Sequence, residues 1–292
     1  MRNAFIQELV TLARQHPQIA LVVGDLGYSV VEPFADEFPD RFINAGVAEQ
    51  NMTGLAAGMA SEGYHVFTYS IANFPTFRCA EQIRNDVAYH QLPVTVVAVG
   101  GGLAYGALGY SHHAVQDYAL MRTLPGMLIA APGDPMETRA CMRYLVDNPG
   151  PSYLRLGKAG EPSFHEQVPI VEPGHWLEVS PGDSNQALLT TGATLGYAIE
   201  LQRNAQGARP TVNSLPLWSM DTKRFQGSQF ARYSTVTTFE DHLLDGGFGS
   251  WLMEAVAQSG GSLDRLHAKA LDPKVCGTVG SQAMLNAYGG LG

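Results

Sequence analysis

Glu49 is the residue whose type and surroundings most suggest chemistry in this chain. It lies in the otherwise uncharged patch Gly46–Asn51, and no Lys or Arg occurs between Arg41 and Arg78. Burial of a carboxylate without a local counter-charge disfavours its charged form, so such a group is suited to sharing a proton with a bound ligand. An acid near the start of a helix also serves as a capping partner or answers the helix dipole, so this residue alone leaves both interpretations open.

Polar and aromatic side chains also gather in three loops, each of which follows an apolar run typical of a buried strand. These loops are Gly24–Ser29, Ser70–Phe77 and Gly100–His113. In parallel α/β sheets ligands bind at the carboxyl ends of the strands, so we expect the loops to meet at one edge of a sheet. Phe74 and Phe77 in the second loop either offer a flat face to a heteroaromatic ring or belong to the core.

The third loop is rich in glycine but does not match a phosphate-binding motif. No Gly-Lys-Ser/Thr follows it, and no helix opens directly after it with an acidic residue at dinucleotide spacing. A close backbone approach is therefore favoured over phosphate binding. The loop ends in the pair His112-His113, and adjacent histidines rarely ligate one metal. We expect one of them to donate a proton to a substrate oxygen, with a hydrogen-bonded structural histidine as the alternative.

Composition indicates a globular protein without a nucleic-acid surface. The 292 residues are 45 % hydrophobic and 15 % charged, with a formal net charge of -9. No apolar run approaches the roughly 18 residues that a membrane span needs, and Met1–Glu8 lacks the features of a signal peptide. The cysteines Cys79, Cys141 and Cys276 lie far apart and fit neither a disulfide framework nor a zinc site. A cytoplasmic location is therefore expected.

Apolar runs alternate with helical patterns, which predicts an α/β fold of two domains, each a mainly parallel sheet flanked by helices. In the first, strands are expected at Ile19–Val23, His65–Tyr69, Val94–Val99, Met127–Ala130 and Ser152–Leu154, and helices at Asn3–Arg14, Ala48–Glu62, Arg78–His90 and Pro135–Val146. In the second, strands are expected at Ala187–Thr191, Pro210–Asn213 and Ser234–Phe239, and helices at Thr194–Arg203 and Phe248–Gln258. The Pro-, Gly- and Ser-containing stretch 159–185 is expected to link domains at 1–158 and 186–292, with little regular structure after Leu271.

Several motifs together resemble the transketolase family of thiamine-diphosphate enzymes. In chain order they are Gly46–Met52, Arg78–Arg84, Gly109–His112, and Glu240–His242 ahead of Gly246–Ser250. The resemblance covers essentially the whole chain, but only the pyrimidine-binding and C-terminal domains of the family. The family's N-terminal domain uses a Gly-Asp-Gly with a downstream Asn, and Gly24-Asp25-Leu26 does not qualify. The resemblance therefore implies the C-terminal half of a split transketolase, with the pyrimidine-binding domain at 1–158.

The resemblance implies that Glu49 activates the cofactor. Glu49 would hydrogen-bond the ring nitrogen of the aminopyrimidine and favour its imino tautomer, which then removes the thiazolium C2 proton. Phe74 would stack on the pyrimidine, and Ile71 and Phe77 would complete the pocket. Asp25 would approach the cofactor across the dimer interface.

The resemblance also implies a substrate site with unusual features. His112 would stabilise or protonate the substrate carbonyl oxygen. Of the family's phosphate ligands, Arg2 and Ser29 match, Lys158 replaces an arginine, and Gly100 falls where a histidine is usual. Leu108 replaces the acid that usually reads a sugar hydroxyl. Lysine loses the bidentate fork, and loss of the acid alters discrimination between hydroxyl configurations. We therefore expect ketol transfer with an anionic, phosphorylated or similar sugar that departs from ordinary pentose phosphates.

A cofactor shared between chains follows from the resemblance. Thiamine diphosphate and Mg²⁺ are implied, with no metal ligand in this chain and an N-terminal transketolase subunit, in an α2β2 assembly, holding the diphosphate and the metal. The other expected partner is a small sugar, with no nucleic acid and no membrane. The alternatives are the β subunit of a 2-oxoacid dehydrogenase E1 component and a non-catalytic regulatory half. The sequence of Gly46–Asn51 favours a transketolase over the dehydrogenase subunit. The presence of Glu49, Phe74 and His112 argues against a half that has lost catalysis.

Overall fold

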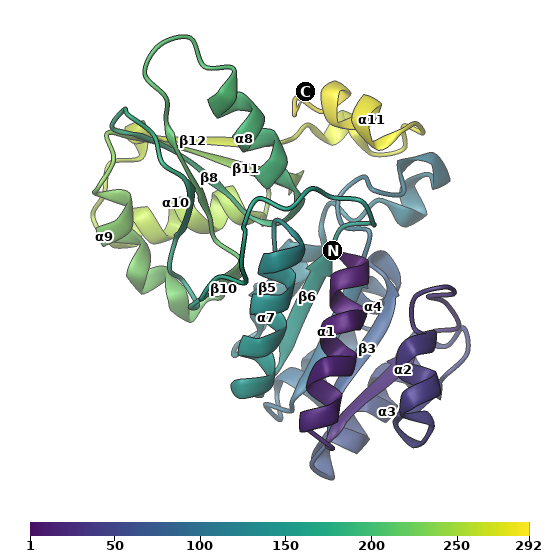
Figure 1. Cartoon of the computed structure of the whole chain (residues 1–292). Helices are drawn as coiled ribbons and strands as arrows, with labels where there is room; N and C mark the ends of the chain where they lie inside the picture. Colours follow the sequence, from purple (N-terminus) through teal and green to yellow (C-terminus); the bar gives the residue numbers. More distant parts are fainter. Residues whose placement is uncertain (292) are drawn as a thin grey trace.

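The chain forms two α/β units, each built on its own sheet (Figure 1). The computed structural model describes residues 1–291, so Gly292, the last residue of the predicted second domain, lies outside the described residues. The prediction of two mainly parallel sheets flanked by helices is confirmed. Within residues 1–291, no helix combines the length and the apolar character needed to cross a membrane.

The strands and helices have the following bounds. The strands are β1 (Ile19–Val23), β2 (Phe42–Asn44), β3 (His65–Ile71), β4 (Val94–Val99), β5 (Leu128–Ala130), β6 (Ser152–Leu156), β7 (Leu177–Ser180), β8 (Gln186–Thr190), β9 (Thr211–Ser214), β10 (Leu217–Trp218), β11 (Thr235–Leu243) and β12 (Leu266–Leu271). The α-helices are α1 (Arg2–Gln15), α2 (Glu32–Glu37), α3 (Glu49–Ser61), α4 (Asn73–Phe77), α5 (Ala80–Gln82), α6 (Asp117–Met121), α7 (Pro135–Asp147), α8 (Leu195–Arg203), α9 (Gln226–Phe230), α10 (Phe248–Gln258) and α11 (Gln282–Tyr288). Shorter helical turns that matter below are the π-helix η2 (Ile83–Ala88) and the 3-10 turns η3 (Gly106–Leu108), η4 (Tyr110–His112) and η8 (Pro273–Val275).

The first sheet brings the three predicted loops to one edge. Its strand order is β10-β5-β6-β4-β3-β1-β2, so β4, β3 and β1 are neighbours and run parallel. Alternating strand residues bury opposite faces: Leu21 packs with α1 and α7, whereas Val22 packs with α3. Because parallel strands end at the same edge, the loops after β1, β3 and β4 lie together, as predicted.

Several elements differ from the sequence prediction. Within the predicted linker, β7 forms the edge of the second sheet, β12-β11-β8-β9-β7, and pairs antiparallel with β9. This strand gives a weak sequence signal because its residues are half-buried or exposed. The helix expected at Arg78–His90 is broken into α5 and the π-helix η2, and α11 forms where little regular structure was expected. The domain boundaries at 158 and 185 stay a prediction.

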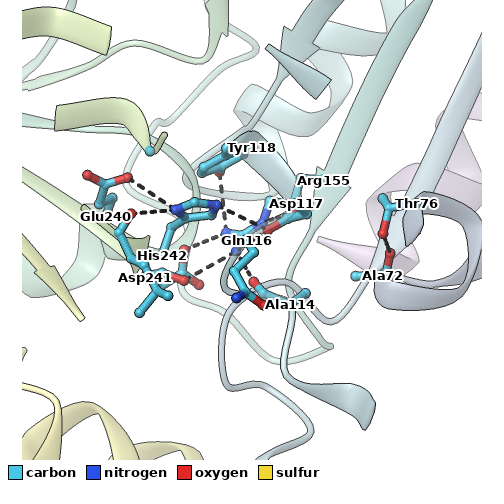
Figure 2. Close-up of polar contacts among 12 residues, drawn as sticks. Ala72, Thr76, Ala114, Gln116, Asp117, Tyr118, Arg155, Glu240, Asp241 and His242 are labelled. Carbon is cyan, nitrogen blue, oxygen red and sulfur yellow. Dashed lines mark hydrogen bonds and ion pairs between the residues drawn. The ribbon is translucent and has the colours of Figure 1, made fainter. Parts of the chain in front are cut away.

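Buried ion pairs join the two units (Figure 2). Arg155 in β6 donates from Nε to Asp117 Oδ2 at 2.7 Å and from Nη2 to the carbonyl of Ala114 at 2.7 Å. Its Nη1 donates to Asp241 in β11 of the second unit. Glu240, beside Asp241, accepts hydrogen bonds from the first amides of α10. Figure 2 shows Glu240, Asp241 and His242 gathered beside Arg155, so the motif at 240–242 lies in this buried centre.

The C-terminal segment packs on the loop that follows β4. In Figure 1 the yellow segment containing α11 lies next to the blue loop region of the first unit. The Gly280 amide donates to the carbonyl of Gly106 at 3.3 Å, and Leu285 is fully buried. A Cβ added at Gly106 would lie 2.5 Å from Leu285 Cδ1, so only glycine allows this close approach. The segment η8–α11 therefore braces the loop between Gly100 and His113.

Candidate functional site

Glu49 is the first residue of α3, and its side chain is only 3 % exposed. Its Oε2 accepts a hydrogen bond from Arg78 Nη1 at 3.0 Å, and the Arg78 side chain is 48 % exposed. The expectation that Glu49 lacks a counter-charge is therefore wrong. Arg78 directly follows α4, which packs against α3, so the fold supplies a cation that is 29 residues away in sequence.

Phe74 lies between this ion pair and His112. The guanidinium carbon of Arg78 is 4.0 Å from the centroid of the Phe74 ring. Phe74 also meets His112 with ring centroids 5.2 Å apart, edge to face. Asn73 in α4 donates to the carbonyls of Ser111 and His113 at 3.2 and 2.8 Å, which fixes α4 to the histidine loop. The structure thus brings Glu49, Phe74 and His112 together at the edge of the sheet.

The two adjacent histidines have different environments. His113 is 1 % exposed, and its Nε2 lies 3.2 Å from the carbonyl of Gly106, so it stabilises the loop. His112 is half-buried, and its Nδ1 lies 3.0 Å from Ser111 Oγ. Burial, with the nearby charges of His113 and Arg78, lowers the pKa of His112 below its ordinary value of 6.5. His112 is therefore neutral at pH 7 and is the histidine available to a ligand.

Two open hollows flank Arg78. The first, of about 430 Å³, is lined by Val47, Ala48, Glu49, Gln50, Asn51 and Arg78. The second, of about 340 Å³, is lined by Asn73, Phe74, Phe77, Arg78, Tyr110, Ser111 and Gln116. Ile71 is partly buried at the end of β3, while Phe77 is 49 % exposed. A larger hollow of about 650 Å³ lies along η2 and includes neither Glu49, Phe74 nor His112. The edge of the sheet that carries Glu49, Phe74 and His112 is therefore open to solvent in this chain.

Asp25 and Ser29 lie in the loop after β1 with unusual backbone conformations. Their φ angles are 54° and 63°, a region that non-glycine residues enter at a cost of roughly 1–3 kcal/mol each. Asp25 Oδ1 accepts hydrogen bonds from Asn44 Nδ2 at 2.9 Å and from Tyr28 at 3.2 Å. The Ser29 amide donates to Glu32 Oε1 at 2.7 Å. These bonds hold the loop in a strained shape at the same edge as Glu49.

The predicted anion ligands Arg2 and Lys158 are neighbours. The Arg2 amide donates to the carbonyl of Lys158 at 3.3 Å, and the buried Nε of Arg2 has no hydrogen-bond partner within residues 1–291. The Lys158 ammonium lies 4.9 Å from the centroid of the Tyr105 ring. Lys158 thus lies beside Tyr105, whose ring centroid is 6.4 Å from that of His112.

Tyr105 also explains the glycine at position 100. Gly100 has φ +81°, and an added Cβ would lie 2.1 Å from Tyr105 Cε2. The tyrosine ring therefore fills the space that a side chain at position 100 would need. Leu108, on the same loop, is 57 % exposed.

Sequence reasoning missed two residues of this site. Arg78 was recognised as part of a motif without a role, and Tyr105 was only one member of a glycine-rich loop. The sequence carries no signal for either contact, because each depends on how a loop folds back. Within residues 1–291, no cluster of three or more His, Cys, Asp or Glu side chains is arranged to hold a metal ion.

Comparison with known proteins gives the same family along most of the chain. Residues 1–160 match the family "Transketolase, pyrimidine binding domain". The chain is 33 % identical over 264 residues to a subunit of apulose-4-phosphate transketolase from Phocaeicola vulgatus, covering 88 % of this chain and 84 % of that protein. It is also 33 % identical over 267 residues to "Putative transketolase C-terminal section" of Methanocaldococcus jannaschii, covering 89 % and 83 %.

A solved structure matches nearly the full length. It is described as "Split gene transketolase, inactive beta4 tetramer", with a TM-score of 0.85 and 31 % identity, covering 99 % of this chain and 93 % of that one. A longer relative, "1-deoxy-D-xylulose-5-phosphate synthase 1" of Geobacter sulfurreducens, is 33 % identical over 267 residues, but the match covers only 40 % of that protein. With the match over residues 1–160, these similarities show that the chain belongs to the transketolase family.

Proposed function

We propose that the chain is the C-terminal subunit of a split, thiamine-diphosphate-dependent transketolase, which transfers a two-carbon ketol unit from a ketose to an aldose. One observation carries this function: the buried carboxylate of Glu49 lines one hollow, and Arg78 connects it to a second hollow lined by Phe74, whose ring meets His112. The relatives described as a transketolase subunit and as a C-terminal section have a similar length, which supports the assignment as one half of an enzyme.

The residues present fit the aminopyrimidine half of thiamine diphosphate. Glu49 offers a carboxylate oxygen at the rim of the hollow and holds a proton at the pyrimidine ring nitrogen. The Phe74 ring offers a flat face, and Ile71 and Phe77 add apolar surface. When bound, the cofactor supplies the nucleophilic carbon that breaks and forms the ketol carbon–carbon bond.

His112 serves as the proton donor to the substrate carbonyl oxygen. Its lowered pKa keeps it neutral, so it carries one ring proton. When Ser111 Oγ donates to Nδ1, that proton sits on Nε2, which is then available to the substrate. The edge-to-face contact with Phe74 orients the ring.

The substrate is anionic, and a phosphorylated sugar fits best. The buried Nε of Arg2 has no hydrogen-bond partner within residues 1–291, and Lys158, whose backbone bonds that of Arg2, supplies a second cation. Ser29 adds a hydroxyl at the same edge of the sheet. Two relatives are described as subunits of apulose-4-phosphate transketolases, which is consistent with a phosphate-bearing sugar other than an ordinary pentose phosphate. The exposed Leu108 replaces a hydroxyl-reading acid and broadens the choice of sugar.

A second subunit completes the site. The hollows beside Glu49 and Phe74 are open, and we assign the diphosphate and Mg²⁺ ligands to an N-terminal subunit in an α2β2 assembly. Asp25 would reach the cofactor across the interface between subunits. Carbohydrate metabolism in the cytoplasm is the setting that this function implies.

Mixing the two subunits tests this function. The purified chain is combined with the transketolase N-terminal subunit of the same genome, thiamine diphosphate and Mg²⁺, and ketol transfer to aldose phosphates is measured. Activity is expected only in the mixture. Ketol transfer by the isolated chain contradicts the split assignment. Oxidative decarboxylation of a 2-oxoacid by the mixture would favour a dehydrogenase E1 subunit instead.

A further inference from the structure

The proposed site offers an aminopyrimidine two contacts, one with the Glu49 carboxylate and one with the Phe74 ring. Arg78 makes both of these contacts at the same time. Its Nη1 donates to Glu49 Oε2 at 3.0 Å, and its Cζ lies over the Phe74 ring, 4.0 Å from the ring centroid. The guanidinium is planar, carries N–H donors in its plane and stacks on aromatic faces. These are also the features by which an aminopyrimidine would bind a carboxylate and a phenyl ring. Arg78 also lines both hollows.

We propose that Arg78 occupies the pyrimidine position in the free subunit and leaves it when the cofactor binds. The inference rests on the proposed function, because it takes Glu49 and Phe74 as the pyrimidine contacts. Arg78 is then a positioning residue: before the cofactor arrives, it compensates the buried charge of Glu49 and keeps the Phe74 face covered.

The exposure of the pair allows this exchange. Glu49 is fixed at the start of α3 and almost fully buried, whereas half of the Arg78 side chain is already in solvent. Arg78 can therefore swing outward without opening the core. An ion pair and a cation–π contact made by a half-exposed arginine each stabilise by about 1 kcal/mol, so the arginine competes with a ligand without blocking it.

The test measures binding of an uncharged probe, 4-amino-5-(hydroxymethyl)-2-methylpyrimidine, to the isolated chain by titration calorimetry or ligand-observed NMR. A neutral probe separates competition at the site from a general change of charge. Arg78→Ala is expected to bind the probe about threefold to tenfold more tightly than the wild type, because two weak competing contacts are lost. Arg84→Ala is the matched control, since Arg84 is exposed and its Nη1 donates to Asn85.

Two further measurements separate competition from a structural role. Added salt screens the ion pair, so the affinity of the wild type should rise with ionic strength while that of Arg78→Ala stays constant. Arg78→Lys keeps the charge but loses the planar group, and it should bind the probe with intermediate affinity. If Arg78 only supported the fold, both Arg78→Ala and Arg78→Lys would bind the probe more weakly than the wild type.

The outcomes distinguish this inference from the proposed function. The role of Arg78 is overturned if Arg78→Ala binds the probe no more tightly than the wild type. The same holds if neither protein binds the probe. If Arg78→Ala binds more tightly, Glu49→Gln in that background should lose the gain. Unchanged affinity in the double variant would instead remove Glu49 from the pyrimidine site and so contradict the proposed function.

Discussion

Two carboxylate–arginine clusters in this chain use the same chemistry in opposite settings. Arg78 meets Glu49 at 3.0 Å with 48 % of the arginine side chain exposed. Arg155 meets Asp117 at 2.7 Å with 2 % of the arginine and none of the aspartate exposed. The distances are similar, so burial of the arginine makes the difference. An exposed arginine can leave its carboxylate for a ligand, whereas a buried one cannot leave without stranding two charges.

The number of satisfied donors sharpens the contrast. Arg155 uses Nε, Nη1 and Nη2 on Asp117, Asp241 and the carbonyl of Ala114, and its guanidinium also packs 4.4 Å from the Tyr118 ring centroid. Arg78 makes one side-chain hydrogen bond and one ring contact. We call the cluster around Arg155 the closed cluster and the pair of Arg78 with Glu49 the open cluster. The closed cluster therefore fixes the position of the two units relative to each other, whereas the open cluster provides contacts that a ligand can replace.

The largest effect is expected from Glu49→Gln in the mixed complex. An amide cannot hold and release the proton, so kcat for ketol transfer should fall roughly 10²–10⁴-fold. The urea midpoint and assembly with the partner subunit should change little, because Gln keeps the size of the side chain. Glu81→Gln, an exposed acid on α5, is the matched control and should remain active. An active Glu49→Gln complex would mean that the open cluster is not catalytic.

Breaking the closed cluster with Arg155→Met should act on stability. Two buried carboxylates, Asp117 and Asp241, would lose their counter-charge, and the free energy of unfolding should fall by about 3–5 kcal/mol. Urea denaturation measures the loss. Arg143→Met removes a half-exposed arginine from its pair with Glu8 and serves as control, with an expected loss of about 1 kcal/mol or less. Equal losses in the two variants would show that burial does not decide the role of these pairs.

The closed cluster should also make stability depend on pH. Burial, with Asp241 nearby, raises the pKa of Glu240 from 4.5 to about 8, against the hydrogen bonds from the Gly249 and Phe248 amides. Between these values the unfolded chain releases the proton and the folded chain keeps it. Stability should therefore be highest below about pH 4.5 on account of this group and fall by about 1 kcal/mol per pH unit up to about pH 8.

Glu240→Gln tests the source of that slope. The amide does not titrate, so the slope due to this group should vanish when unfolding free energies are measured from pH 5 to pH 8. The variant should also be less stable overall, because one of the two α10 amides loses its acceptor. A slope identical to that of the wild type would assign the titration to another group, such as Glu137, whose pKa burial raises to about 7.

The smallest effect is expected from Arg78→Met on stability. Arg78 is half-exposed, so water screens its contact with the buried Glu49, and the free energy of unfolding should change by about 1 kcal/mol. Urea denaturation at low and high salt measures it, and the difference from the wild type should shrink with salt. If Arg78→Met lowers the free energy of unfolding as much as Arg155→Met does, both arginines have the same structural role and the contrast between the two clusters is wrong.

Much of the fold was predictable because its central strands are largely apolar. The runs at β1, β3 and β4 are buried along nearly their whole length, and continuous burial leaves a clear sequence pattern. The two-residue strand β10 lies far along the chain but pairs antiparallel with β5 in the first sheet, and β7 is a half-exposed edge strand. Neither has a periodicity long enough to predict.

Predictability of the site divides in the same way. Phe74 and His112 follow β3 and β4, which end at one edge, so their proximity followed from topology. Glu49 follows β2, which was not among the predicted strands, so its place beside them rested on the family resemblance. The contact of Arg78 with Glu49 depends on the direction in which α4 leaves β3, and the contact of Tyr105 with Gly100 depends on a loop folding back on itself. Sequence spacing holds no information on either direction. The chemical roles of all these residues stay predictions.

The brace formed by η8–α11 has a consequence for the order in which the chain is made. Gly280 and Leu285, which hold Gly106, are synthesised more than 170 residues after it. At about 5–20 residues per second, the loop carrying His112 waits roughly 10–35 s on the ribosome for its support. A chain released after Leu271 would keep Glu49, the first sheet and the bonds from Asn73, but the histidine loop would lose the support of Gly280 and Leu285. A segment translated long after the first sheet thus supports the loop that carries one of the proposed catalytic groups.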